Sequence, residues 1–136
     1  MGSATNYFEN VVLDSILGAN KSSLSPTTVY ISLFTSAPDD GGSGTEVVSV
    51  GTGYARVAVT NNGTNWPAAI SAVKSNGAKI QFPTATASWG TITHFAIHDA
   101  STSGNMLLYG ELLSPISPIA GNAPYFEVSS LNITAD

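Results

Sequence analysis

The sequence contains no cysteine and few basic residues. The absence of cysteine excludes disulfide bonds, thiolate nucleophiles, cysteine-ligated zinc and iron–sulfur clusters. Lysine and arginine together number 4 against 9 acidic residues, which gives a formal net charge of -5 at pH 7. Because so few cations neutralise few backbone phosphates, nucleic acid is not expected as a partner.

Long hydrophobic runs are absent as well. No apolar segment approaches the ~20 residues that a membrane-spanning helix needs, so no membrane partner is expected. Residues 1–6 have neither a basic start nor an apolar stretch, so no secretory signal is expected. With 43% hydrophobic and 10% charged residues the chain is typical of a globular protein, and its 136 residues predict a single domain over 1–136.

Hydroxyl-bearing and turn-forming residues dominate the composition. Ser and Thr together number 32 and Gly and Pro 20, a mixture that favours strands and turns over helices. We therefore predict a mostly β protein, an antiparallel β-sandwich or jelly-roll-like domain over residues 27–134. Runs rich in β-branched and aromatic residues mark the expected strands, at 29–34, 54–59, 78–82, 92–98, 106–112, 125–128 and 131–134.

One segment has the spacing of a helix instead. Asn6, followed by Glu9 three residues later, fits a capping box, and Gly18 suits a left-handed residue just after a helix. The pattern predicts one short amphipathic N-terminal α-helix over 5–18, which packs either on its own domain or on a neighbour. Its apolar positions are 8, 12 and 16, and again 13 and 17.

Two features resemble metal sites but have simpler explanations. His94 and His98 are four residues apart, yet on a strand this spacing separates them by about 13 Å, too far to share one ion. The acidic, glycine-rich segment 39–44 lacks the alternating acids and the distal Glu of a calcium loop. A turn built from residues that tolerate positive φ explains it without a ligand. No metal is expected at either place.

Patterns that support catalysis are missing too. The nine carboxylates are scattered, and no spacing pairs two of them as a glycosidase requires. No Gly-x-Ser-x-Gly elbow occurs, and residues 51–54 lack the third glycine and the following helix of a dinucleotide site. We therefore expect no enzyme activity and no cofactor. The scattered carboxylates argue in particular against a carbohydrate-active hydrolase.

Aromatic residues and the single arginine are the candidates for contacts with other proteins. Trp66 and Trp89 lie at turns, where each either closes the end of the core or anchors another subunit. Arg56, beside Tyr54, either faces solvent or makes a bidentate contact with a carboxylate across an interface. The candidate interface set is Trp66, Trp89, Arg56 and Tyr54, together with Phe8 and Tyr7 of the expected helix.

Several phrases occur in a fixed order along the chain. They are NYFEN at 6–10, TVYISLFTSAP at 28–38, GTEV at 44–47, GYARVAV at 53–59, NWPA at 65–68, IQFPTATA at 80–87 and SWGTITHF at 88–95. With these phrases the sequence resembles a family of small bacteriophage virion proteins that are usually labelled tail fibre proteins. The resemblance implies a structural component of the phage particle, made in the host bacterial cytoplasm, and brings no catalytic residues with it.

The size of the chain bears on its place in the particle. A receptor-binding fibre normally needs a long stalk, from sustained heptads or a β-stalk, and this chain has neither. One small β domain suits a capsid decoration (cement) protein that forms a homo-oligomer and binds the major capsid protein. The alternative is a tail or head fibre module that binds tail components and attaches to the host surface.

Overall fold

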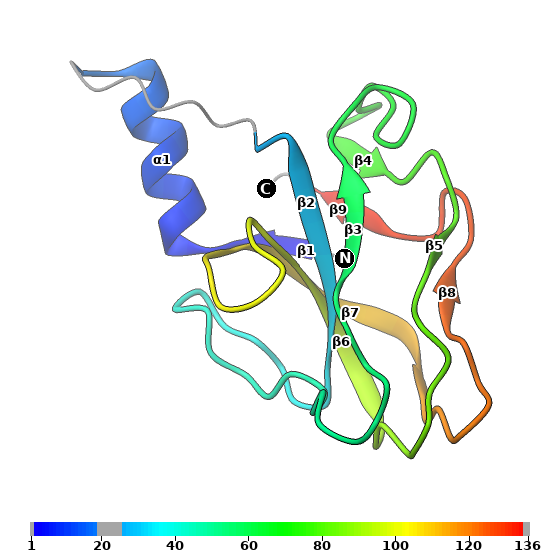
Figure 1. Ribbon diagram of the computed structural model, residues 1–136. Helices are drawn as coiled ribbons and strands as arrows, with labels where there is room; N and C mark the ends of the chain where they lie inside the picture. The colour runs from blue at the N-terminus through cyan, green and yellow to red at the C-terminus, as the bar shows by residue number, and fades with distance from the viewer. Residues whose placement is uncertain (1, 19–25, 135–136) are drawn as a thin grey trace.

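A five-stranded antiparallel sheet forms the main layer of the molecule. In the computed structural model, which describes residues 2–18 and 26–134, its strands follow the order β1-β7-β6-β2-β3 (Figure 1). Each neighbouring pair is antiparallel. The strands are β1 Gly2–Ala4, β2 Thr28–Phe34, β3 Val57–Thr60, β6 Ile92–His98 and β7 Met106–Ile116.

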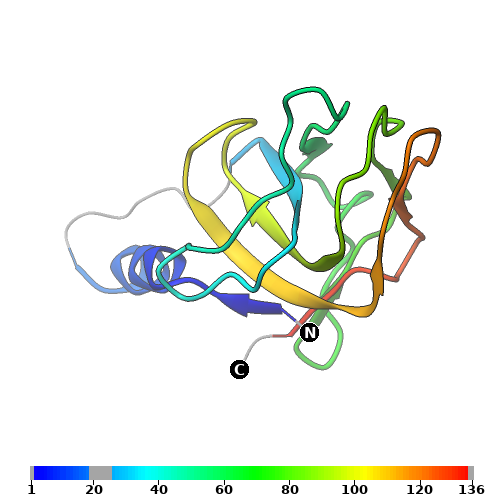
Figure 2. The same ribbon diagram turned by 90° about the horizontal axis from the view of Figure 1, so that it is seen from below.

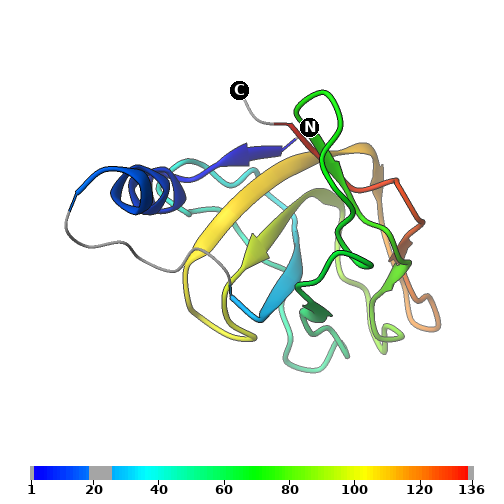
Figure 3. The same ribbon diagram turned by 90° about the horizontal axis from the view of Figure 1, so that it is seen from above.

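Two small antiparallel sheets pack against one face of this sheet (Figures 2 and 3). One pairs β4 Val73–Ser75 with β9 Asn132–Thr134, and the other pairs β5 Ile80–Gln81 with β8 Tyr125–Phe126. This arrangement confirms the mostly β antiparallel sandwich. Among the described residues the three sheets remain separate, so the sandwich does not close into a barrel.

The main core lies between these layers. Because side chains alternate along a strand, β2 directs Ile31 and Leu33 toward the small sheets, where Leu131 meets them. Aromatic rings fill one end of this core. Tyr54 and Trp89 meet edge to face with ring centroids 5.3 Å apart, and Phe82 stacks on Tyr54.

A second, smaller core lies on the opposite face of the main sheet. It joins Phe34 of β2 to Ala96 of β6 and Met106 of β7. The loop over 39–44 covers it, and a Cβ at Gly44 would come within 3.1 Å of the Phe34 ring, at a φ of +112°. Glycine is required there both for space and for backbone conformation.

The helix α1 spans Asn6–Ile16, inside the range predicted from the sequence. Its N-cap is Thr5 rather than Asn6, because the Thr5 Oγ1 accepts a hydrogen bond from the Phe8 N–H at 3.3 Å. The same hydroxyl donates to the Met106 carbonyl of β7 at 2.6 Å, which ties the start of the helix to the sheet. Gly18, just beyond the helix, has a φ of +119°, as the sequence indicates.

The largest differences between the predicted and the observed strands concern β1, β4 and the segment 54–59, while other strands differ only in where they end, as β7 does by running to Ile116. The sequence analysis did not predict β1 or β4. Because β1 comes before the helix, the main sheet begins at Gly2, and along the chain α1 stands between β1 and β2. Both strands are only three residues long, and each is held by backbone pairing with a longer or buried partner. Of the segment 54–59, only Val57 to Val59 joins a strand, while Tyr54 and Arg56 lie before it and make side-chain hydrogen bonds to Glu46.

Candidate interaction surfaces

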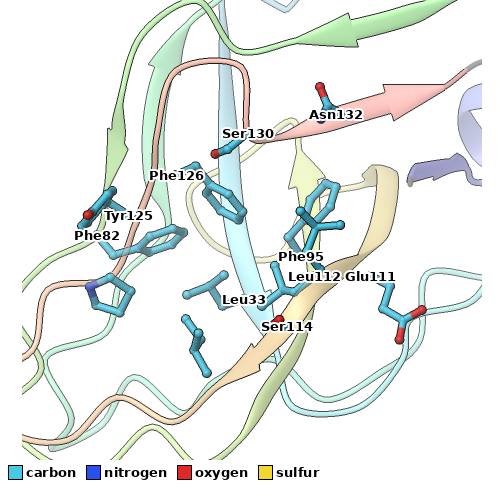
Figure 4. Close-up of a pocket in the computed structure, with 13 residues that line it drawn as sticks. Leu33, Phe82, Phe95, Glu111, Leu112, Ser114, Tyr125, Phe126, Ser130 and Asn132 are labelled. Carbon is cyan, nitrogen blue, oxygen red and sulfur yellow. The ribbon is translucent and has the colours of Figure 1, made fainter.

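An apolar cleft opens between β7 and β8 (Figure 4). Its volume is about 230 Å³. Phe126, Phe95 and Leu33 form its floor and belong to the main core or pack against it, so the cleft is an opening in the side of the sandwich. Tyr125 and Phe82 lie at one end, and Glu111 lies at the other (Figure 4).

A bulge in β7 keeps this cleft open. While β6 advances two residues, from Ile92 to His94, the paired residues of β7 move from Ile116 to Glu111. Residues 112–115 of β7 thus lie opposite the single residue Thr93 of β6, so three of them are extra, and the strand bends away from the sheet. Beyond the bend β8 pairs with β5 and not with β7, so no backbone hydrogen bonds close the gap.

The rim of the cleft combines apolar and polar groups. Leu113, at the bulge, is 99% exposed, and Tyr125 is also exposed. The Lys79 ammonium lies 4.0 Å from the centroid of the Tyr125 ring, a cation–π contact that holds the ring at the edge of the cleft. Glu111 and Asn132 add a carboxylate and an amide. The cleft therefore offers a flat apolar surface beside hydrogen-bonding groups, the usual make-up of a ligand site.

The sequence analysis did not identify this cleft. The adjacent residues Leu112 and Leu113 are the signal that could have indicated it. Neighbouring residues of a strand point to opposite faces, so where only one face of the strand is covered by a core, one of two adjacent leucines must be exposed.

The helix α1 forms a second apolar surface. None of its side chains is buried, and Tyr7, Leu13 and Ile16 are exposed. The helix stands beside the sheet at the β1 edge, and all three views place it on the side of the molecule away from β8 (Figures 1–3). Of the six predicted interface residues, Tyr7 and Phe8 are the two that belong to this surface.

The other four predicted interface residues lie in the interior of the domain. Trp66, Trp89 and Tyr54 are buried, and the Arg56 side chain is 8% exposed. The Trp89 indole donates to the Thr52 carbonyl at 2.9 Å, while the Trp66 indole N–H has no acceptor among the described residues. Both tryptophans therefore close the core, the first of the two alternatives that their turn positions allow.

Arg56 makes the bidentate contact with a carboxylate, but within its own chain. Its Nε and Nη2 donate to the two oxygens of Glu46 at 2.9 and 2.8 Å, and Nη1 donates to the carbonyls of Ala100 and Ser103. Burial acts to raise the pKa of Glu46, yet the hydrogen bonds from Arg56 and Tyr54 hold it below its ordinary value. Burial, reinforced by the Glu46 carboxylate, raises the pKa of Tyr54. This network fastens the loop over 35–56 to the loop between β6 and β7, and the Tyr54 hydroxyl, which accepts from the Leu33 N–H of β2 at 2.9 Å, fastens it to the sheet.

The two histidines remain separate. His98 is buried and its Nδ1 lies 3.1 Å from the Ser32 hydroxyl, while His94 is half-buried beside Thr93. Asp39 accepts hydrogen bonds from the backbone N–H groups of Gly41 and Ser43, as a turn requires. Within residues 2–18 and 26–134, no group of three or more metal-ligating side chains comes together.

The comparisons with known proteins add the family. A family model described as Podophage GP4 fiber I protein gp80 matches residues 3–134, nearly the whole chain. The chain belongs to this phage fibre family. No curated protein matches the sequence.

Membership of a phage fibre family confirms the resemblance that the ordered phrases indicated and makes the chain a bacteriophage structural protein, a component of the phage particle. It supports the fibre alternative better than capsid decoration. Across the described part of the chain, the structure holds no helix with the length and hydropathy that crossing a bilayer requires.

Proposed function

We propose that this chain is a non-enzymatic fibre module that attaches the phage to its host, and that the β7–β8 cleft receives a cell-surface glycan. The observation that carries the proposal is an open aromatic cleft on a member of a fibre family. A sugar ring has one apolar C–H face and a rim of hydroxyls. The exposed Tyr125 ring can pack against the apolar C–H face, and Glu111 and Asn132 can form hydrogen bonds with the hydroxyls.

The position of the cleft favours this role. β8, which forms one wall of the cleft, lies on the side of the domain away from α1 (Figures 1–3), so α1 is left to join the module to the rest of the particle. Cell-surface glycans are repetitive, and several weak clefts on one particle bind them with high avidity. A cleft of about 230 Å³ for one sugar unit suits such multivalent attachment.

The test is competition for adsorption. Host cells are incubated with the purified protein, and the rate of phage adsorption is then measured. We expect the wild-type protein to slow adsorption and Tyr125→Ala to weaken this effect about tenfold or more, the loss that removal of a central aromatic contact causes. Val50→Ala, at an exposed valine outside the cleft, is the matched control. Failure of the wild-type protein to bind host cells at micromolar concentration would refute the proposal.

Capsid decoration is distinguished by the same assay. A decoration protein binds the shell of its own particle and gives no protection of host cells, so adsorption proceeds at the normal rate at any concentration of the purified protein.

A further inference from the structure

A hollow lies beside Trp66, next to the main core. Its volume is about 490 Å³, within the range of sites that bind small molecules. Most of the side chains that line this Trp66 hollow are apolar, so an apolar molecule that entered it would remove water from their surfaces. These apolar walls are Phe8 of α1, Val29 of β2, Ile97 of β6, Leu107 and Leu108 of β7, and Ile133 of β9.

The indole N–H of Trp66 is a hydrogen-bond donor without an acceptor. Trp66 is 7% exposed, and its Nε1 atom has no hydrogen-bond partner among the described residues. A buried donor in this state has lost its hydrogen bond to water and gained none, which costs free energy, so such groups are rare. The other tryptophan, Trp89, donates to the Thr52 carbonyl. Trp66 can therefore donate to an acceptor that a ligand supplies.

The turn over 61–67 fixes the position of this indole. The side-chain oxygen of Asn62 accepts the backbone N–H groups of Thr64 and Asn65 at 3.1 and 2.9 Å, and its carbonyl accepts the Trp66 N–H at 2.9 Å. The Asn65 carbonyl accepts the Gly77 N–H at 2.7 Å, which ties the turn to the segment after β4. Because Trp66 is already held in place, a ligand would not have to order it.

Lys74 of β4 gives the Trp66 hollow a positive charge. It is half-buried, and it makes no ion pair within residues 2–18 and 26–134, where the one ion pair joins Arg56 to Glu46. Lys74 also borders a second hollow, which contains Glu9 and Asp40, but it pairs with neither of them. None of the described side chains that line the Trp66 hollow is acidic. The ammonium therefore has no counterion there.

Two donors in an apolar hollow indicate the class of ligand. A carboxylate accepts hydrogen bonds on two oxygens, and its charge complements an ammonium. We propose that the Trp66 hollow binds an apolar monocarboxylate of the medium-chain fatty-acid type, with its chain on the apolar walls and its carboxylate on the Trp66 N–H and the Lys74 ammonium. This site shares no lining residue with the β7–β8 cleft, so the proposal does not depend on glycan binding.

The first test follows the indole N–H signals of isotope-labelled protein by NMR while octanoate is added at neutral pH. The chain has 2 tryptophans, so Trp66→Phe and Trp89→Phe assign the signals. We expect the Trp66 signal to move downfield until the site is saturated, because its N–H gains an acceptor. The Trp89 signal, whose N–H is already bonded, stays in place. Octanol and octylamine, which lack the carboxylate, should bind at least tenfold more weakly than octanoate.

The second test removes the charge of the hollow. Lys74→Met keeps a long apolar side chain and should raise the dissociation constant of octanoate at least tenfold while leaving that of octanol unchanged. Lys79→Met is the matched control, since Lys79 lies over the Tyr125 ring outside the Trp66 hollow, and it leaves both constants unchanged. An unmoved Trp89 signal verifies that each variant keeps the fold.

Three results would overturn the proposal. The first is an unmoved Trp66 signal at millimolar octanoate. The second is octanol that binds as tightly as octanoate, which would make the hollow a site for apolar molecules without a role for charge. The third is a folded Lys74→Met variant that binds octanoate with the wild-type dissociation constant.

Discussion

Replacement of His98 by glutamine is expected to flatten the pH dependence of unfolding between pH 6.5 and 4. The His98 ring is 4% exposed, stacks parallel to Phe34 with ring centroids 6.3 Å apart, and its Nδ1 lies within hydrogen-bond distance of the Ser32 hydroxyl. A charged imidazole fits poorly in this place because it would lose its hydration.

The magnitude follows from the pKa of His98. Burial, and then the nearby Arg56 cation, lower it from 6.5 to about 4, while Glu46 and Asp99 act in the opposite direction. Between these two pH values the unfolded chain binds a proton that the folded chain does not, so stability is full above pH 6.5 and is lost as the pH falls. The full loss is about 3 kcal/mol, of which about 2 kcal/mol is lost by pH 5.

The assay is urea denaturation followed by tryptophan fluorescence at pH values from 7.5 to 4.5. Glu46, whose pKa is held below its ordinary value, loses its stabilising effect only at lower pH, so the two effects separate. We expect His98→Gln to remove most of the loss between pH 7 and 5, and His94→Gln, the control, to retain the wild-type profile. An unchanged slope in His98→Gln would contradict the reasoning.

Three further predictions concern stability at neutral pH, each measured by the same denaturation assay. Arg56→Ala leaves the Glu46 carboxylate without its bidentate partner and should cost about 3 kcal/mol, and a cost below about 1 kcal/mol would argue against a structural role for the pair. Trp89→Phe removes an indole N–H that donates a hydrogen bond, whereas Trp66→Phe removes an indole N–H that has no acceptor among the described residues. We therefore expect Trp89→Phe to destabilise the domain by at least about 1 kcal/mol more than Trp66→Phe, and a larger cost for Trp66→Phe would contradict this. Thr5→Ala removes the N-cap of α1 and its bond to β7 and should cost about 2 kcal/mol, with helical circular dichroism lowered in parallel; an unchanged helix signal would show that the cap is dispensable.

Strand positions with strong side-chain patterns were predictable from the sequence. Residues 92–98 were predicted to form a strand and form β6 with the same bounds, because Ile92, Phe95 and Ile97 are β-branched or aromatic and reach a core. β1 and β4 could not be predicted in this way. Gly2–Ala4 has no strand-forming side chain, and its conformation comes from backbone bonds to β7, which is more than 100 residues away in the sequence.

Burial of the interface candidates could not be predicted, because it depends on contacts between distant residues. Arg56 was recognised as a residue suited to a bidentate partner, yet only the fold shows that Glu46 of the same chain occupies that position. Exposure of the cleft could not be predicted either. Leu113 is 99% exposed although leucine is typical of a core, and the β7 bulge that exposes it has no short sequence signal.

The most direct test of the account is the position of this chain in the intact phage. The density of the whole particle, reconstructed by electron microscopy at a resolution that shows strands, can be searched for the sandwich with its protruding α1. The account predicts that the domain lies in projecting fibres, with the β7–β8 cleft facing outward. A regular array of single copies across the capsid shell, with the cleft turned toward the major capsid protein, would contradict it.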